Sequence, residues 1–313
     1  MIADRSGLER ALMQVEEMLH DLISSDVSLL KQASKHVVSA GGKRLRPRLV
    51  FLSFEAAGGG DDLSSAVPVA AAIELIHTAS LVHDDINDQS ELRRGHATIN
   101  ARWGDTLALL TGDFIFLKVL GLAAEFDADV TRVLARACTM LVEGETLQTE
   151  TQSKSQSTEE SYIEIVGRKT ASLFSACAEL GAILAGAPPE VRIALRDYGY
   201  NFGVAFQLRD DVLDLVGSRQ NLGKPVVQDL DQEKMSLALL HALSECDEAQ
   251  EIILSKDRDA VMDLLKSTGA IEYANRRTSE YLEAAKRQLS LLPPSVSRDT
   301  LAGLTGLAED REA

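Results

Sequence analysis

The pattern of apolar and polar positions along the chain favours helices over strands. Only seven prolines occur, at positions 47, 68, 188, 189, 225, 293 and 294, and the segments between them are rich in Ala, Leu and Glu. Long proline-free segments of this composition favour helix. The strict alternation that is typical of half-buried strands is absent over any useful length. We therefore predict an all-α chain without a sheet.

Groups of glycine and proline mark the predicted ends of the helices, at 41–42, 58–60, 186–189 and 217–225. The polar run 149–160 predicts a loop, and its end, Ser-Thr-Glu-Glu at 157–160, predicts a capping box that opens the next helix. No linker is long or biased enough to separate domains, and no internal repeat is visible. Residues 1–313 are therefore expected to form a single helical domain.

The segment 69–88, VAAAIELIHTASLVHDDIND, is apolar nearly all round until its last turn. A helix that is apolar on every face is buried in the centre of a protein. The most apolar window, 106–124, is interrupted by Asp113 and Lys118, and these charges argue against a membrane span.

The composition is that of a soluble globular chain, with 45% hydrophobic and 26% charged residues. The formal net charge is −16, so the chain has no general attraction for nucleic acid or anionic lipid. Any polyanionic ligand must then meet a local basic cluster or a bound metal. Neither nucleic acid binding nor stable membrane insertion is expected.

The three cysteines, Cys138, Cys177 and Cys246, lie in apolar stretches without C-x-x-C spacing. This placement indicates small buried side chains in a reducing compartment. The N-terminal residues lack the basic and then apolar pattern of a signal peptide. We expect a cytoplasmic protein.

Two aspartate clusters share the pattern D-D-x-x-D: HDDIND at 83–88 and RDDVLD at 209–214. Residues i and i+4 of a helix lie about 6 Å apart on one face. The resulting carboxylate pairs are Asp84 with Asp88 and Asp210 with Asp214. Close carboxylates repel each other unless a cation lies between them. All-oxygen donors without Cys or His suit Mg²⁺, which typically bridges carboxylates to substrate phosphates. A solvated acidic face is the alternative, but both clusters end strongly apolar helices, where unused acidic residues are costly.

Two basic clusters complement these aspartates. GGKRLRPR at 41–48 places four cations in six residues of an acidic chain, and Arg93-Arg94 follows the first aspartate cluster. Alone, the first run would be a solvated turn, but beside helices that bind metal and phosphate it indicates an anion site. His77 and His83 are isolated, and taken alone each indicates a packed core histidine.

Several motifs occur together in a fixed order. They are GGKRLRP at 41–47, HDDIND and then SELRRG within 83–95, GETLQ at 144–148, KT at 169–170 and FQLRDDVLD at 206–214. With these motifs the chain resembles the trans-isoprenyl diphosphate synthases, the polyprenyl synthetase family, from about residue 7 to 310. The resemblance implies a bundle of core helices around a deep central cavity and a homodimer.

The resemblance also implies a reaction. An allylic diphosphate loses pyrophosphate, the double bond of isopentenyl diphosphate attacks the allylic cation, and the departing pyrophosphate takes a proton. The product is an all-trans prenyl diphosphate that is five carbons longer. Magnesium ions, about three in this family, and basic side chains stabilise the charge that develops on the leaving group.

The residue roles implied by the resemblance fall into three sets. The metal ligands are Asp84, Asp85, Asp88, Asp210, Asp211 and Asp214. The allylic diphosphate is held by Arg93, Lys169, Lys224 and Lys234, and Thr170 and Gln207 place oxygen dipoles beside the cation. Isopentenyl diphosphate is held without metal by Lys43, Arg46, His77 and Arg94. The segment 233–238, EKMSLA, departs from the usual G-K-x-T-L-P of the family but keeps the lysine and a hydroxyl.

Product length is predicted from two small residues, Ala79 and Ser80, one turn before Asp84. In this family, bulky aromatics at these positions close the cavity and stop growth at fifteen or twenty carbons. Here the tail can pass along the helix, which predicts a product of about thirty to fifty carbons. A geranylgeranyl or farnesyl diphosphate synthase is the alternative. A terpene cyclase and a non-catalytic modulating subunit of a heteromeric synthase are less favoured, because both aspartate clusters and GGKRLRP are present.

Overall fold

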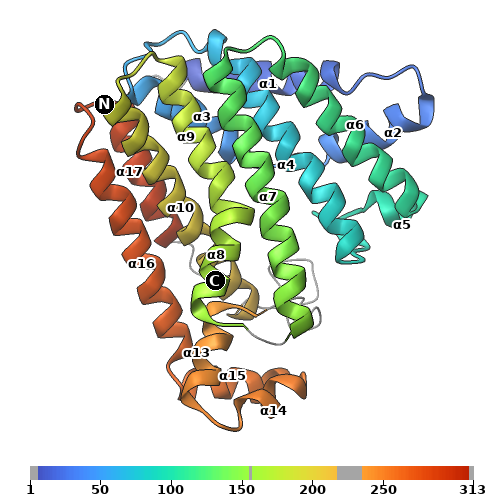
Figure 1. Cartoon of the computed structure of the whole chain (residues 1–313), viewed down its shortest axis with the longest axis vertical. Coiled ribbons are helices and arrows are strands. Elements are labelled where there is room, and N and C mark those ends of the chain that lie inside the picture. Colours follow the sequence, from blue (N-terminus) through green and yellow to red (C-terminus); the bar gives the residue numbers. More distant parts are fainter. Residues whose placement is uncertain (1–5, 155–156, 217–234, 310–313) are drawn as a thin grey trace. The chain divides into compact units, whose positions relative to one another are not determined.

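The computed structural model describes residues 6–154, 157–216 and 235–309 (Figure 1). These residues are helical over most of their length, so the all-α prediction is confirmed. The prediction of no sheet is wrong at one hairpin, in which β1 (Leu92–Arg93) pairs antiparallel with β2 (His96–Ala97). Its turn residues, Arg94 and Gly95, have φ of 51° and 79°, the conformation of a tight hairpin turn. Strands of two residues are too short to show alternation in the sequence.

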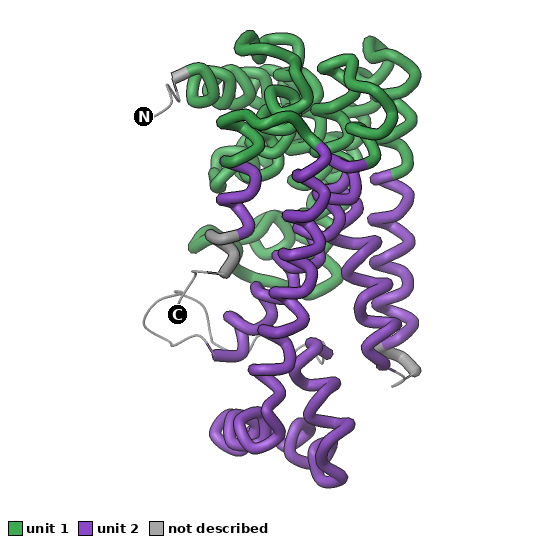
Figure 2. Tube along the Cα trace, turned by 90° about the vertical axis from the view of Figure 1, so that its left-hand side faces the viewer, with its two compact units in different colours: residues 1–136, 176–193, 292–299 green, residues 137–175, 194–291, 300–313 purple. Residues whose placement is uncertain are grey.

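The described chain forms two compact units (Figure 2). Unit 1 contains residues 1–136, 176–193 and 292–299, and unit 2 contains residues 137–175, 194–291 and 300–313. Neither unit is a continuous stretch of sequence. Four of the boundaries fall inside helices α7 (Ala128–Lys154), α9 (Ser172–Leu184), α10 (Pro189–Val216) and α17 (Val296–Glu309), and the fifth lies just before α17.

Unit 1 is organised around α4 (Val67–Asn87), which contacts α1 (Ser6–Leu22), α3 (Leu45–Ala56) and α6 (Asp105–Ala123). Figure 1 shows α4 and α6 side by side. The remaining elements of this part of the chain are α2 (Ser28–Ser39), η1 (Ser64–Ala66) and α5 (Ile99–Trp103). Nearly every α4 residue from Val67 to Val82 is buried. The prediction of a central buried helix over 69–88 is therefore confirmed.

The outer face of α6 carries four leucines, Leu109, Leu110, Leu117 and Leu120, that are between 51% and 65% exposed. By length and composition alone, α6 and the segment Ser64–Asn87 would each qualify as a membrane span. The charges Asp113 and Lys118 therefore do not disqualify α6 on composition. The segment that contains α4 is mostly buried within unit 1, as expected of a core helix.

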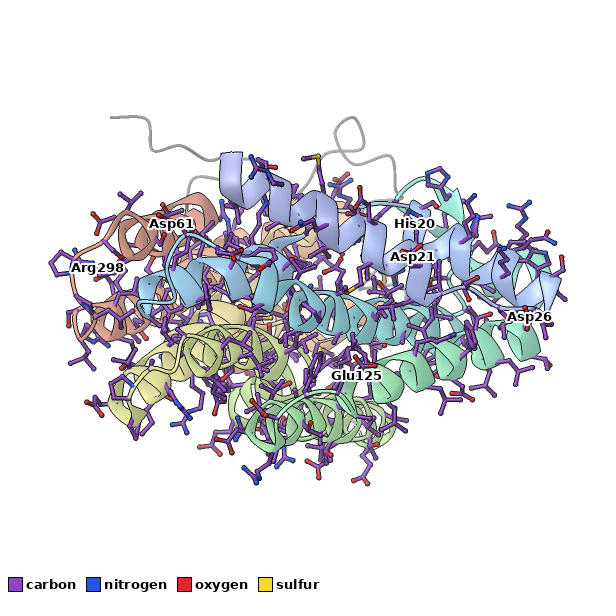
Figure 3. All side chains as sticks on the ribbon, turned by 90° about the horizontal axis from the view of Figure 1, so that it is seen from above. His20, Asp21, Asp26, Asp61, Glu125 and Arg298 are labelled. Atoms are coloured by element: carbon purple, nitrogen blue, oxygen red, sulfur yellow. The ribbon has the colours of Figure 1, made fainter. Side chains whose placement is uncertain are left out.

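Charged side chains lie on the outside of unit 1, as Asp21, Asp26, Asp61 and Glu125 do in Figure 3. The three cysteines are free, and Cys177 is buried, whereas Cys138 and Cys246 are only partly buried. Burial raises the pKa of the Cys177 thiol to about 12 and that of Cys138 to about 11. Both side chains are therefore neutral thiols at neutral pH.

Unit 2 contains α8 (Glu159–Val166), η2 (Gly167–Ala171), α13 (Leu237–Glu245), α14 (Ala249–Leu254), α15 (Arg258–Ser267) and α16 (Ala270–Leu289). Its core has two buried apolar clusters, one centred on α13 and α15 and one between α8, α10 and α13. The predicted loop over 149–160 is partly wrong, because α7 continues to Lys154. The capping box is shifted by one residue, since Thr158 is the N-cap and Ser161 returns the hydrogen bond.

Candidate active site

The first carboxylate pair lies at the C-terminal end of α4. Asp84 and Asp88 are both partly exposed, and the Asp88 N–H donates to the Asp84 carbonyl at 2.8 Å, which continues the helix to its last turn. The C-terminal end of a helix carries partial negative charge. Two carboxylates at this end are unfavourable by themselves, and a bound cation would relieve both repulsions.

Asp85, the middle aspartate of this cluster, forms hydrogen bonds with other residues of unit 1. It is 5% exposed, and Arg93 Nε donates to its Oδ1 at 2.7 Å. Asn100 Nδ2 donates to its backbone carbonyl at 3.2 Å. These contacts attach the β1–β2 hairpin and α5 to the end of α4. The contact also brings together two predicted ligands, Asp85 for metal and Arg93 for diphosphate.

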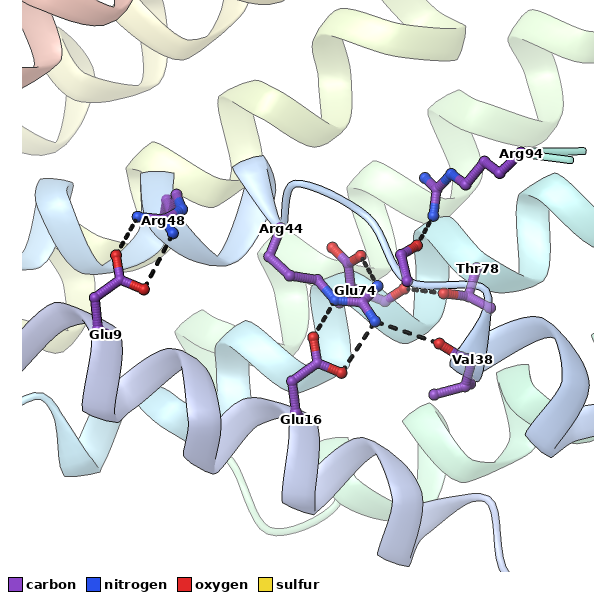
Figure 4. A network of polar contacts seen from close by, with 9 residues as sticks. Glu9, Glu16, Val38, Arg44, Arg48, Glu74, Thr78 and Arg94 are labelled. Atoms are coloured by element: carbon purple, nitrogen blue, oxygen red, sulfur yellow. Dashed lines mark hydrogen bonds and ion pairs between the residues drawn. The ribbon is translucent and has the colours of Figure 1, made fainter. Parts of the chain in front are cut away.

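Arg44 holds the basic segment before α3 to two neighbouring helices (Figure 4). It has a left-handed φ of 47° and is 8% exposed. Its guanidinium forms an ion pair with Glu16 and another with Glu74, the second at 2.7 Å, and donates to the Val38 carbonyl at 3.3 Å. Two carboxylates thus compensate one buried cation, and this arginine serves the fold.

Arg48 has a similar role at the surface, where its Nη1 lies 2.9 Å from Glu9 Oε1 (Figure 4). Two of the four cations in this cluster, Arg44 and Arg48, therefore pair with glutamates of the fold. Lys43, which is exposed, and Arg46, which is partly buried, are the two that the resemblance assigns to isopentenyl diphosphate.

Arg94 closes the same region from the hairpin by donating to the Gly41 carbonyl (Figure 4). A Cβ at Gly42 would lie 2.8 Å from Arg94 Nη1, so a side chain there would displace the guanidinium. The guanidinium of Arg94 thus packs directly against the backbone at 41–42, 53 residues before it in the sequence. This contact brings Arg94 beside the Lys43 segment.

His77 lies among these arginines. Burial lowers the pKa of its imidazole well below the usual value, and the positive charges of Arg46, Arg94, Arg93 and Arg44 lower it further. The side chain is therefore neutral at pH 7. It lines a small cavity of about 30 Å³ with Arg93 and Arg94, while Lys43 and Arg46 are not among the lining residues.

The second carboxylate pair, Asp210 and Asp214, is partly exposed near the C-terminal end of α10. Its middle aspartate again contacts protein groups. Tyr162 Oη donates to Asp211 Oδ2 at 2.5 Å, and Gln207 Nε2 donates to Asp211 Oδ1 at 2.7 Å. In both clusters, therefore, the i,i+4 pair is partly exposed and the middle residue is held within its own unit.

Lys169 and Thr170 lie on η2, a single turn of π-helix between α8 and α9. Single π turns of this kind frequently occur at functional sites. Lys169 pairs with Glu145 and lies 3.4 Å from Gln148 Oε1, so the GETLQ segment of α7 holds its ammonium. Thr170 Oγ1 donates to Gln207 Oε1 at 3.0 Å.

These side chains surround a cavity of about 180 Å³ within unit 2. Its lining includes Lys169, Thr170, Gln207 and Asp211 among the predicted site residues, while Asp210 and Asp214 are not among them. Tyr162 and Gln148 also line it. The predicted ligands Lys224 and Lys234 lie outside the described residues.

The two residues predicted to set product length are buried in unit 1. Ala79 is fully buried, and Ser80 is nearly so, with its hydroxyl donating to the His77 carbonyl at 2.9 Å. Neither adds bulk to α4 beyond a methyl or a hydroxymethyl group.

Sequence reasoning missed three residues that hold predicted site residues or their segments: Arg44 in unit 1, and Tyr162 and Glu145 in unit 2. Arg44 and Glu145 lie inside motifs that the sequence singled out, but nothing in a motif separates a residue that binds a ligand from one that holds the fold. Tyr162 gave no signal beyond its place about two helical turns before the KT pair.

Comparison with known proteins places the chain among enzymes of one kind. The sequence profile described as polyprenyl synthetase matches residues 27–267. The octaprenyl diphosphate synthase of Escherichia coli K12 is 36% identical, over 99% of this chain and 96% of its own. A short chain isoprenyl diphosphate synthase of Methanothermobacter thermautotrophicus is 37% identical, over 96% and 98%.

A crystal structure gives the same result. The polyprenyl synthase from Caulobacter crescentus, complexed with calcium and isoprenyl diphosphate, superposes with a TM-score of 0.91 at 35% identity, covering 99% of this chain and 97% of that one. The chain belongs to the polyprenyl synthetase family and is a prenyltransferase. The family and fold predicted from the motifs are confirmed.

Proposed function

We propose that this chain condenses isopentenyl diphosphate with an allylic diphosphate to give an all-trans polyprenyl diphosphate of about thirty to fifty carbons. The observation that carries the proposal is the repeated arrangement of an i,i+4 carboxylate pair at a helix end. Asp84 and Asp88 form one pair, Asp210 and Asp214 the other, and both are partly exposed. Basic side chains accompany each pair within its own unit.

The donor chemistry of these pairs fits Mg²⁺. Each pair offers two carboxylates, and among the described residues no group of three or more His, Cys, Asp or Glu gathers around one point. Magnesium usually takes one or two protein carboxylates and completes its shell with water and substrate phosphate oxygens. About three ions, as in the family, would neutralise the charge that develops on the departing diphosphate.

The basic residues would bind the two diphosphates. Arg93 and Lys169, with Lys224 and Lys234, would hold the allylic diphosphate, and Thr170 and Gln207 would face the allylic cation. Lys43, Arg46, His77 and Arg94 would hold isopentenyl diphosphate. The neutral state of His77 at pH 7 suits a hydrogen-bond donor to an anion, while the arginines supply the charge.

The long product is supported by the small volume of Ala79 and Ser80 and by the octaprenyl relative. If a growing tail passes along α4 as proposed, a phenylalanine at either position would obstruct it. Replacing Ala79 by Phe should therefore shorten the product sharply while the first condensation continues. Wild-type product of twenty carbons or fewer would favour the geranylgeranyl or farnesyl alternative.

We also propose that the 313 residues act as one cytoplasmic, homodimeric domain without nucleic acid or membrane partners. The family profile spans 27–267 and so crosses both units. The exposed leucines of α6 give a second copy an apolar surface to cover. Because both carboxylate pairs are present, a non-catalytic subunit is not favoured.

The purified chain alone, with Mg²⁺, isopentenyl diphosphate and geranyl or farnesyl diphosphate, tests the proposal. We expect chain elongation that EDTA abolishes and Mg²⁺ restores. Cyclised hydrocarbon from the allylic substrate alone would indicate a terpene cyclase. Elongation only after a second protein is added would indicate a modulating subunit.

A further inference from the structure

The cavity of unit 2 contains a chain of hydrogen bonds that ends on a residue without a role in the proposed chemistry. Tyr162 Oη donates to Asp211 Oδ2, Gln207 Nε2 donates to Asp211 Oδ1 and Thr170 Oγ1 donates to Gln207 Oε1, at 2.5, 2.7 and 3.0 Å. All four residues line the same cavity. They come from α8, α10 and η2.

The direction of each hydrogen bond follows from the groups involved. An ionised carboxylate only accepts, so Asp211 forces the Gln207 side chain to present its NH₂ group and fixes the orientation of the amide. The Gln207 carbonyl oxygen must then point the other way, toward Thr170. The Thr170 proton is in turn directed at that oxygen, which leaves the hydroxyl lone pairs for other contacts in the cavity.

Tyr162 fixes the remaining oxygen of Asp211. Its ring is 8% exposed and belongs to an apolar cluster with Val166, Leu208 and Leu237. A ring packed in this way holds its hydroxyl in one place. Both oxygens of Asp211 therefore accept hydrogen bonds from neutral donors that the fold positions.

The cavity lining distinguishes this pair from the carboxylates proposed to bind metal. Gln207 and Asp211 are four residues apart on α10, as Asp210 and Asp214 are. Together the four positions have the i, i+3, i+4, i+7 spacing of neighbouring residues on a helix, so the two pairs lie side by side. The cavity lining includes Gln207 and Asp211 and neither residue of the other pair.

We propose that Tyr162 is a positioning residue for prenyl transfer, and that Asp211 orients Gln207 and Thr170 instead of binding metal directly. The inference rests on the proposed function, in which the oxygens of Gln207 and Thr170 face the allylic cation. Loss of the Tyr162 hydroxyl would allow the side chains of Asp211 and Gln207 to rotate. The oxygen dipoles would then be misplaced at the moment when the positive charge develops.

The first test replaces Tyr162 by Phe, which keeps the ring and removes the hydroxyl. Tyr273→Phe is the matched control, because Tyr273 Oη also donates to a carboxylate of unit 2, Glu159 Oε2, at 2.5 Å and is not part of the hydrogen-bond chain. Loss of a group that orients an active-site residue typically costs roughly 10- to 100-fold in activity. We expect that loss in kcat for Tyr162→Phe, with KM for both substrates within about twofold of wild type. The control should keep kcat within about twofold.

A double-variant cycle with Thr170→Val separates positioning from a structural effect. If Tyr162 acts through the hydrogen-bond chain, Tyr162→Phe/Thr170→Val should lose no more kcat than the more damaging single variant. Multiplying losses would overturn the inference. So would wild-type kcat in Tyr162→Phe.

Asp211→Asn tests the assignment by a different measurement. An amide at 211 can still accept from Gln207 and donate to the Tyr162 oxygen, so the chain of contacts survives. The half-saturating Mg²⁺ concentration should stay within about twofold of wild type for Asp211→Asn and rise for Asp210→Asn. An equal rise in the half-saturating Mg²⁺ concentration for both variants would show that Asp211 binds metal and would overturn the inference. Wild-type protein without prenyl transfer would instead refute the proposed function, and the inference with it.

Discussion

Two cations of the basic run at 43–48 hold the fold through carboxylates of neighbouring helices. Arg44 is 8% exposed between Glu16 and Glu74, and Arg48 pairs with Glu9. Lys43 and Arg46 belong to the same run of four, and the resemblance assigns them to isopentenyl diphosphate. Substitutions in this run should therefore have two distinct kinds of effect.

Replacing Lys43 or Arg46 by Ala should raise KM for isopentenyl diphosphate about tenfold or more and leave KM for the allylic substrate nearly unchanged. Arg93→Ala and Lys169→Ala should show the opposite preference. Steady-state kinetics with each substrate varied in turn measures both constants. Equal changes in both KM values would indicate that these residues belong to a single diphosphate site.

Arg44→Ala is the contrasting variant, and it should lower the unfolding free energy by about 3 kcal/mol or more, because it leaves Glu74 buried without its cation.

His77 gives unit 1 a distinct pH dependence. Its pKa is lowered by burial and by four arginines, so the folded chain binds its proton less readily than the unfolded chain does. This contribution to stability is complete above the unfolded value of about 6.5 and is lost as the pH falls below it.

Between pH 6.5 and 5.5 the wild-type chain should therefore lose up to about 1.4 kcal/mol more unfolding free energy than His77→Gln does. Urea denaturation at pH 7.5, 6.5 and 5.5 measures the difference. His20→Gln, at an exposed position, is the control substitution. Parallel curves for wild type and His77→Gln would show that the imidazole takes up its proton equally in both states.

At the level of elements, η2 depends on a close approach by α7. A Cβ at Gly144 would lie 2.6 Å from the backbone nitrogen of Lys169, closer than real contacts allow. The π turn therefore occupies space that a side chain on α7 would fill. This packing places Lys169 beside Glu145, which follows Gly144 on α7.

Gly144→Ala should displace the π turn and lower both kcat and the thermal midpoint, with an overpacking cost of about 1–3 kcal/mol. Gly303→Ala on α17 is the matched control, because a Cβ there meets nothing within 4 Å. The control should keep full activity and gain stability from the better helix propensity of Ala. Unchanged activity and midpoint in Gly144→Ala would show that the turn adapts at no cost.

Helices and their ends were predictable from the sequence where nearby residues determine them, and less predictable elsewhere. The buried helix over 69–88 follows from its apolar residues on all sides, and Pro68 and the terminal aspartates mark its ends. The β1–β2 hairpin and η2 were not predictable, because each depends on contacts with residues far away in the chain. At the site, the spacing of the aspartates and the motif order identified the residue types. The contacts that hold the middle aspartate of each cluster became visible only from the positions of Arg93, Tyr162 and Gln207 in space.

At the scale of the whole molecule, the outer face of α6 gathers several exposed leucines of the described chain. Leu110, Leu117 and Leu120 follow one another at spacings of seven and three residues, which puts them on one side of the helix, with the exposed Asp113 between them. An apolar face of this kind is suited to packing against another helix. A second copy of the chain would bury it.

If the chain dimerises through this face as proposed, Leu117→Glu should weaken or abolish the dimer. Light scattering with size-exclusion chromatography, over a range of protein concentrations, measures the mass directly. Leu254→Glu, at a similarly exposed leucine on α14, is the control and should leave the wild-type mass unchanged. A monomeric wild type, or a dimer that both variants preserve, would exclude α6 as the interface.

The most direct test of the central claim is turnover of Asp84→Ala and Asp210→Ala with saturating substrates and Mg²⁺, beside Asp26→Ala as an exposed control. Each of the first two variants removes a carboxylate from a pair that the account assigns to metal. Both should stay folded and fall below about a tenth of wild-type kcat, a loss of more than ~1.4 kcal/mol in transition-state stabilisation. The Asp26 variant should match wild type. If Asp84→Ala or Asp210→Ala keeps more than that tenth, its carboxylate pair does not hold the catalytic metal.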